Sequence, residues 1–127
     1  MNLSQKYSDN EVSSLGQVEL ESRALIKSAA KLNHIKENWE VEKSQLSEAL
    51  DKNRLLWTVI ASAMQEDSNL QSKEIKTNIT NLALFIFQRT ISLLAEPKPE
   101  GLDILININM NIAKGLGEHP KEEASPA

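Results

Sequence analysis

The side chains of this sequence that could do chemistry are two histidines and a scatter of carboxylates, and neither group has the spacing of a reactive site. His34 falls on the polar side of a predicted helix, and His119 falls in a polar C-terminal segment. The carboxylates Glu37, Glu40 and Glu42 gather near a predicted turn, where such groups are usually solvated. The sequence has no cysteine, no glycine-rich phosphate loop and no HxxxH or ExxH spacing. An enzyme needs converging reactive groups, so we expect no catalysis, small-molecule substrate, cofactor or metal.

Two asparagines are better placed for a specific role, because Asn53 and Asn109 each stand at the centre of an otherwise apolar helix face. A buried carboxamide without hydrogen bonds costs about 1–3 kcal/mol, so each must find partners. Either they bond to each other or to nearby backbone and fix the register of the helices, or they line a groove and bond to an incoming helix. Trp57 shares the face of Asn53 and is expected in the core. Arg54, at the edge of that face, is either solvated or steers an acidic partner.

Four predicted helices carry these side chains. The first two cover about residues 18–37 and 44–64, and apolar residues recur in both at the helical period. No glycine or proline separates them, so a turn near Asn38 to Val41 rests only on a break in phase, and one long bent helix is the alternative. The third helix follows the polar segment EDSNLQS, where Asp67, Ser68 or Ser72 could cap it, and stops before Pro97 and Pro99.

The third predicted helix is apolar on two sides. Its main stripe, expected in the core, consists of Ile75, Ile79, Leu82, Ile86 and Leu93. A second stripe of Leu84, Phe87 and Ile91 lies nearly opposite. A helix of this kind is either held between neighbours or offers one side to a partner. We expect part of the second stripe to be a docking surface, because four helices around one core rarely bury every side of any member.

The segment ILININMNIAKGL at 104–116 fits both a strand and a helix. At period two its isoleucines share one face, whereas at period 3.6 Leu105, Asn109, Ile112 and Leu116 share a side. A strand must pair with another strand, and the other segments of the chain are predicted helices. We therefore predict a helix that buries Asn109 and ends near the glycines at 115 and 117.

Composition agrees with a single small helical domain. The chain has 127 residues, 40% of them hydrophobic, 4% aromatic and only four glycines and four prolines. These values favour an all-α bundle of about four helices over a turn-rich sandwich or barrel. We expect one domain at 17–116, between a polar N-terminal tail (1–16) and a disordered C-terminal tail (117–127), with both termini flexible. The absence of a secretory pattern and of a long apolar run predicts a cytoplasmic protein without membrane insertion.

A basic stripe on the first helix raises the possibility of RNA contact. Arg23, Lys27, Lys31 and His34 share one side of this helix. The whole chain carries a net charge of −4, however, and Glu19 and Glu37 flank the stripe. We therefore expect a solvated face, and direct RNA contact is the weaker alternative.

Three stretches of the sequence resemble the FlaF family of flagellar biosynthesis regulators. ALDKNRLLWTVI at 49–60 resembles the AL..NR.LWT motif of that family, and ININMNIAKGL at 106–116 resembles its closing motif IN.NIA.GL. SRALIKSAAKL at 22–32 is similar to the family's first helix. The likeness extends from about Tyr7 to Leu116.

The resemblance implies a function that periodicity does not reveal. FlaF proteins act positively on flagellin production, oppose the translational repressor FlbT and bind flagellin as an export chaperone. The expected partners are therefore flagellin and, as a second candidate, FlbT. The alternative function is that of a translational regulator, which contacts flagellin mRNA directly or through FlbT. The residues predicted to bind a partner are Asn53, Arg54, Trp57, Leu84, Phe87, Ile91 and Asn109.

Overall fold

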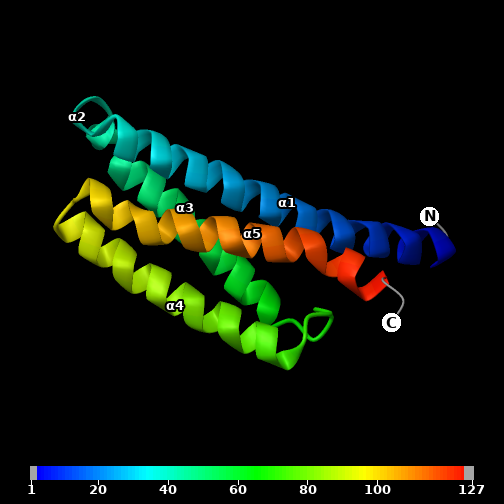
Figure 1. Ribbon diagram of the computed structural model, residues 1–127. Coiled ribbons are helices and arrows are strands. Elements are labelled where there is room, and N and C mark those ends of the chain that lie inside the picture. Colours follow the sequence, from blue (N-terminus) through cyan, green and yellow to red (C-terminus); the bar gives the residue numbers. More distant parts are fainter. Residues whose placement is uncertain (1–2, 125–127) are drawn as a thin grey trace.

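Helices make up the regular structure of this protein. The computed structural model describes the backbone of residues 3–124 and the side chains of residues 16–117. Its α-helices are α1 (Leu3–Glu37), α2 (Trp39–Glu42), α3 (Leu46–Met64), α4 (Lys73–Ala95) and α5 (Asp103–Ala124), and the 3-10 turns η1 (Lys43–Gln45) and η2 (Pro99–Leu102) precede α3 and α5. The long helices run alternately up and down as a bundle (Figure 1). The predicted all-α class is confirmed, and the segment at 104–116 is helix.

The turn between α1 and α3 forms without glycine or proline because Asn38 breaks the helix. Its backbone, with φ −121° and ψ 40°, leaves the helical region. Its side-chain Nδ2 donates to the carbonyl oxygen of His34 at 2.9 Å, which satisfies one acceptor at the C-terminus of α1. Asparagine competes with helical backbone bonds in this way and therefore favours helix ends. The predicted turn is confirmed, and the alternative of one long bent helix is excluded.

The ends of α4 follow from local chemistry. Of the three candidate caps, Ser72 is the one used: its backbone is extended and its Oγ accepts from the backbone N–H of Ile75 at 3.2 Å. At the other end, Pro97 and Pro99 follow the last helical residue, Ala95. The backbone of Glu96, before Pro97, leaves the helical region with φ −140° and ψ 83°, and that of Lys98, before Pro99, is extended. Pro99 then opens η2, where its fixed φ suits the first turn.

The core is shared unequally among the helices. α5 packs mainly on α1, and α4 packs mainly on α3, while α1 and α3 join the two pairs. α4 and α5 run antiparallel beside each other (Figure 1), but their backbones approach closely at few points. The side between α4 and α5 is therefore the loosely closed side of the bundle. The fully buried side chains include Leu25, Leu32, Ile35, Leu50, Trp57, Ile60, Ile86, Leu102 and Leu105.

Both outer helices extend beyond the ends predicted for them. α1 begins at Leu3, inside the segment expected as an N-terminal tail, and α5 continues through Gly115 and Gly117 to Ala124. Residues 3–15 contain no glycine or proline that would stop a helix. A glycine inside a helix costs about 1 kcal/mol, which neighbouring turns offset. The predicted start of the first helix at about residue 18 and the predicted end of the last helix near the glycines at 115 and 117 are therefore corrected. Residues 1–2 and 125–127 lie outside the described residues.

Candidate partner-binding site

A polar layer crosses the centre of the bundle. Trp57 of α3 donates through Nε1 to Oδ1 of Asn109 on α5 at 2.9 Å. Asn109 Nδ2 donates to Oδ1 of Asn53 at 2.7 Å and, more weakly, to the carbonyl oxygen of Leu25 at 3.4 Å. The hydroxyl of Ser28 on α1 donates to the same Asn53 oxygen at 2.8 Å. This layer joins α1, α3 and α5 through side chains that apolar residues surround.

The layer decides between the two roles considered for the asparagines. Asn53 and Asn109 bond to each other, to Trp57 and to backbone, so they fix the register of the bundle. The side chains of all three residues are 0% exposed. A partner could reach them only if the helices separated. Of the seven residues predicted to bind a partner, these three are therefore buried, and Trp57 belongs to the core as expected.

Among the side chains that the structure describes, two buried polar atoms have no hydrogen-bond partner. They are Nδ2 of Asn53 on α3 and Oγ1 of Thr90 on α4. Thr90 is almost fully buried, and the sequence pattern did not single it out. α4 thus contributes a hydroxyl to the core without joining the bonded layer. The hydrogen bonds of the polar layer come from α1, α3 and α5.

Two of the three residues in the second stripe of α4 are exposed, and their role as a docking surface stays a prediction. Leu84 is 55% exposed and Ile91 is 67% exposed, while Phe87 between them is half-buried. Leu94, 46% exposed, extends the stripe by one turn and was missed by the sequence reasoning. The spacing i, i+3, i+7 and i+10 of these four residues could have revealed it. We call these residues, Leu84, Phe87, Ile91 and Leu94, the outer stripe.

Arg54 is the remaining predicted contact residue, and its charge is already paired. Its guanidinium donates to Oδ1 of Asp51, one turn earlier on α3, from Nη2 at 2.8 Å and from Nε at 3.3 Å. Both side chains are roughly half exposed, so the pair contributes little to stability. An acidic partner would have to compete with Asp51 for this guanidinium.

On the opposite flank of α4, between α4 and α5, lies an apolar groove. Its volume is about 230 Å³. It is lined by Gln71, Ile75, Asn78, Ile79, Leu82, Ile112, Gly115 and Leu116. The sequence assigned its apolar residues to core stripes, because the pattern of one helix does not show how closely the next helix approaches. We call this feature the α4–α5 groove.

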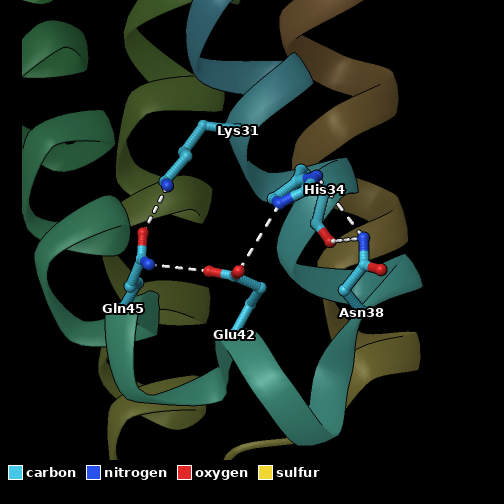
Figure 2. Close-up of polar contacts among 5 residues, drawn as sticks. All are labelled: Lys31, His34, Asn38, Glu42 and Gln45. Carbon is cyan, nitrogen blue, oxygen red and sulfur yellow. Dashed lines mark hydrogen bonds and ion pairs between the residues drawn. The ribbon is translucent and has the colours of Figure 1, made fainter.

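The basic stripe of α1 is largely occupied by contacts within the protein. Lys31 Nζ donates to Oε1 of Gln45, whose Nε2 donates to Glu42 at 2.6 Å (Figure 2). His34 Nε2 lies 3.7 Å from the same Glu42 carboxylate and pairs with it when protonated. Farther along α1, Arg23 is paired with Glu19 at 2.6 Å. The carboxylates of Glu19 and Glu42 offset positive charge at Arg23 and His34, whereas Gln45 is neutral and leaves the charge of Lys31 in place. The stripe is therefore a partly offset positive surface, which weakens the case for RNA binding.

One carboxylate on α1, that of Glu21, is buried. Glu21 is 5% exposed, and burial raises the pKa of its carboxyl, an effect that a hydrogen bond from Gln17 partly opposes. Close by, the hydroxyl of Ser22 donates to the carbonyl oxygen of Ala113 at 2.9 Å and ties α1 to α5. The sequence pattern did not single out Glu21, because apolar, charged and polar residues alternate around it without a clear helical stripe.

The described residues hold no group of three or more histidine, cysteine, aspartate or glutamate side chains arranged to bind a metal ion. Within the same part of the chain, no helix has both the length and the apolar character needed to span a bilayer.

The fold defines an up-and-down helical bundle with a polar layer in its core and apolar residues exposed along α4. Comparison with protein families identifies the chain. The family model of the flagellar protein FlaF matches residues 3–116, and the chain belongs to this family. It is therefore a flagellar protein. No curated protein and no solved structure gives a match.

Proposed function

We propose that this FlaF protein binds flagellin in the cytoplasm as an export chaperone and promotes flagellin production, opposing FlbT. The observation that carries the proposal is the uncovered apolar surface of α4 in a member of a flagellar family. Exposed apolar residues at helical spacing suit an amphipathic helix as the partner, because its own apolar face would replace water along the bundle. The partner would be a flagellin chain before its export and assembly.

The proposed activity is binding and not catalysis. Its support is the type of exposed residue: the outer stripe offers leucine, isoleucine and half-buried phenylalanine, which contribute contact area rather than reactive groups. Arg54 lies on α3, the helix on which α4 mainly packs, and can steer an acidic segment of the partner if it leaves Asp51.

We propose that the effect on translation runs through FlbT. A chaperone that holds free flagellin changes how much flagellin other proteins encounter, so it can alter translation without touching the message. The pairing of Arg23 with Glu19 and of His34 with Glu42 supports this route over direct contact with RNA. A regulator that bound RNA through this stripe would lose affinity steeply as salt is added.

The test is co-elution of the purified full-length protein with flagellin on a sizing column at micromolar concentrations. We expect a joint peak for the wild type and a reduced one for Ile91→Asp, which places a charge on the outer stripe. Val41→Asp is the matched control, because Val41 is also strongly exposed, at 80% against 67% for Ile91, but lies on α2. Separate elution of the wild type from flagellin would contradict the proposal.

A second experiment locates the bound segment. Immobilised wild-type protein is incubated with separate N-terminal and C-terminal fragments of flagellin. We expect one terminal fragment to be retained, because the proposed contact needs an amphipathic helix and a single helix satisfies it.

A further inference from the structure

Helix α4 stands at one end of the packing order of the bundle. α4 packs mainly on α3, α3 also packs on α1, and α1 packs on α5, so α4 and α5 are the two end members. Polar contacts nevertheless tie α5 to its neighbours. Asn109 bonds to two side chains of α3, Ser22 of α1 donates to the carbonyl oxygen of Ala113, and Lys36 of α1 lies 2.6 Å from Asp103. These contacts hold α5 at its start, its middle and near Ala113.

α4 has no comparable set of polar contacts. Among the side chains that the structure describes, one hydrogen bond joins α4 to another helix or its end: Gln65, just after α3, donates through Nε2 to Oγ1 of Thr80 at 3.4 Å on the surface. Within the same part of the chain, no ion pair joins α4 to another helix. Apolar packing of residues such as Ile79, Ile86 and Leu93 therefore holds α4 in place.

The buried polar atoms without a hydrogen-bond partner, Nδ2 of Asn53 and Oγ1 of Thr90, belong to α3 and α4. These helices are antiparallel, and the bond between Gln65 and Thr80 marks their register. At 1.5 Å per residue, Asn53 lies about 18 Å and Thr90 about 15 Å along the pair from that bond. The two atoms are therefore at nearly the same level of the bundle. Each of them destabilises the packed arrangement relative to one in which water reaches it.

The segments that connect α4 to the rest of the bundle contain no α-helix. Residues 65–72 precede α4, and most of their side chains are exposed. After α4, the backbone of Glu96 leaves the helical region, and Pro97 has no backbone N–H with which to continue the helix. Both segments can therefore change their backbone angles without breaking an α-helix.

We propose that α4 opens as one unit, moving away from α3 about these two segments while the polar layer holds α1, α3 and α5 together. Opening lets water reach the hydroxyl of Thr90 and the amide of Asn53. The open form is a minor state, because the apolar side chains of α4 favour the packed form. A partner that binds the apolar faces uncovered by opening would raise its population. The motion itself requires no partner, so the inference stands apart from the proposed function.

The test is native-state hydrogen exchange, followed by NMR on the full-length protein in urea below its unfolding transition. Backbone amides in the middle of α4 should exchange at least about a hundredfold faster, relative to unstructured peptide, than those in the middle of α1, α3 and α5. Comparable protection of all four helices would overturn the proposal.

Asn109→Leu separates opening of α4 from unfolding of the whole bundle. The hydrogen bonds that it removes are present in both the packed and the open form. Exchange in α1 and α5 should therefore become about thirtyfold faster, while exchange in α4 stays as in the wild type. Asn111→Leu, the same substitution at an exposed position of α5, should change neither rate. If α4 accelerates in parallel with α1 and α5, it does not open by itself and the proposal is wrong.

Thr90→Val tests the contribution of the unpaired hydroxyl. Valine keeps the branched shape of threonine without the polar atom, so the packed form should gain stability and exchange in α4 should slow by about tenfold. Thr77→Val, at an exposed position of the same helix, is the matched control and should leave exchange unchanged. Faster exchange in α4 of Thr90→Val would show that the hydroxyl is paired in the packed form, which contradicts the proposal. Circular dichroism checks that each variant is folded.

Discussion

Replacing Asn109 by leucine removes the member of the polar layer that holds the other side chains together. The two side chains share the same branched skeleton, so the change deletes hydrogen bonds with little change in shape. Asn109 accepts from Trp57 and donates to Asn53 and to the carbonyl oxygen of Leu25. After the substitution, Asn53 still accepts from Ser28. The indole N–H of Trp57, however, is left buried without an acceptor.

The expected loss follows from that orphaned donor. A buried polar group that loses its partner costs about 1–3 kcal/mol, and the new apolar side chain recovers part of this. We expect Asn109→Leu to lower the free energy of unfolding by about 2 kcal/mol. Trp57→Phe removes the donor itself. In the double variant the two losses should therefore be less than additive, with a coupling of about 1–2 kcal/mol.

Urea unfolding followed by circular dichroism measures these differences, provided that the slope with urea is the same for all variants. The control is Asn111→Leu, the same substitution at an exposed position of α5, which should change the free energy of unfolding by less than about 0.5 kcal/mol. An Asn109→Leu variant as stable as the wild type, or additive losses in the double variant, would refute the reasoning about the polar layer.

Three further variants probe other features of the fold. Burial raises the pKa of the Glu21 carboxyl above its ordinary 4.5. The stability that the protonated carboxyl contributes is therefore fully present below pH 4.5 and is lost as the pH rises through the pKa of the folded protein. Glu21→Gln should be more stable than the wild type at neutral pH, and its urea unfolding should depend less on pH. Ser72→Ala deletes the cap that accepts from Ile75 and should cost about 1 kcal/mol. Gly101→Ala places a Cβ 2.5 Å from Cδ2 of Leu93 and should cost about 1–3 kcal/mol by overpacking, measured in the same way.

Each of these variants has a control or a contrary outcome. For Glu21→Gln, a pH dependence equal to that of the wild type would show that this carboxyl is not the titrating group. Ser68→Ala, in the same loop, should leave the free energy of unfolding unchanged, since Ser68 does not cap α4. Gly16→Ala should stabilise α1 by about 0.5–1 kcal/mol, because an added Cβ meets nothing there. A Gly101→Ala protein as stable as Gly16→Ala would mean that Leu93 moves aside freely.

The sequence predicted the features that depend on one helix at a time. The period of the apolar residues located α3 and α4 closely, and the prolines at 97 and 99 marked the end of α4. The choice of helix for 104–116 was also correct, because it rested on the absence of a strand to pair with. The helix ends at Leu3 and Ala124 were not predicted. Glycine and polar residues have a low helix propensity, but they do not end a helix by themselves. They therefore predict the position of a helix end poorly.

Features that depend on two helices were predicted less well. The sequence placed Asn53 and Asn109 on apolar faces, but it could not say that these faces meet, so binding and structural roles stayed open until the hydrogen bonds of the layer were seen. The α4–α5 groove was also missed, because the pattern of one helix does not show its distance from the next. Leu82 and Ile112 lie on expected core stripes, and the spacing between α4 and α5 leaves both side chains half-buried.

The most direct test of the account is a methyl NMR titration of the isotope-labelled full-length protein with unlabelled flagellin. Binding along the outer stripe predicts saturable shifts of the methyl resonances of Leu84, Ile91 and Leu94, with little change at Leu32, which is buried on α1. Methyl resonances of these three residues that stay in place while flagellin is added to excess would contradict the account.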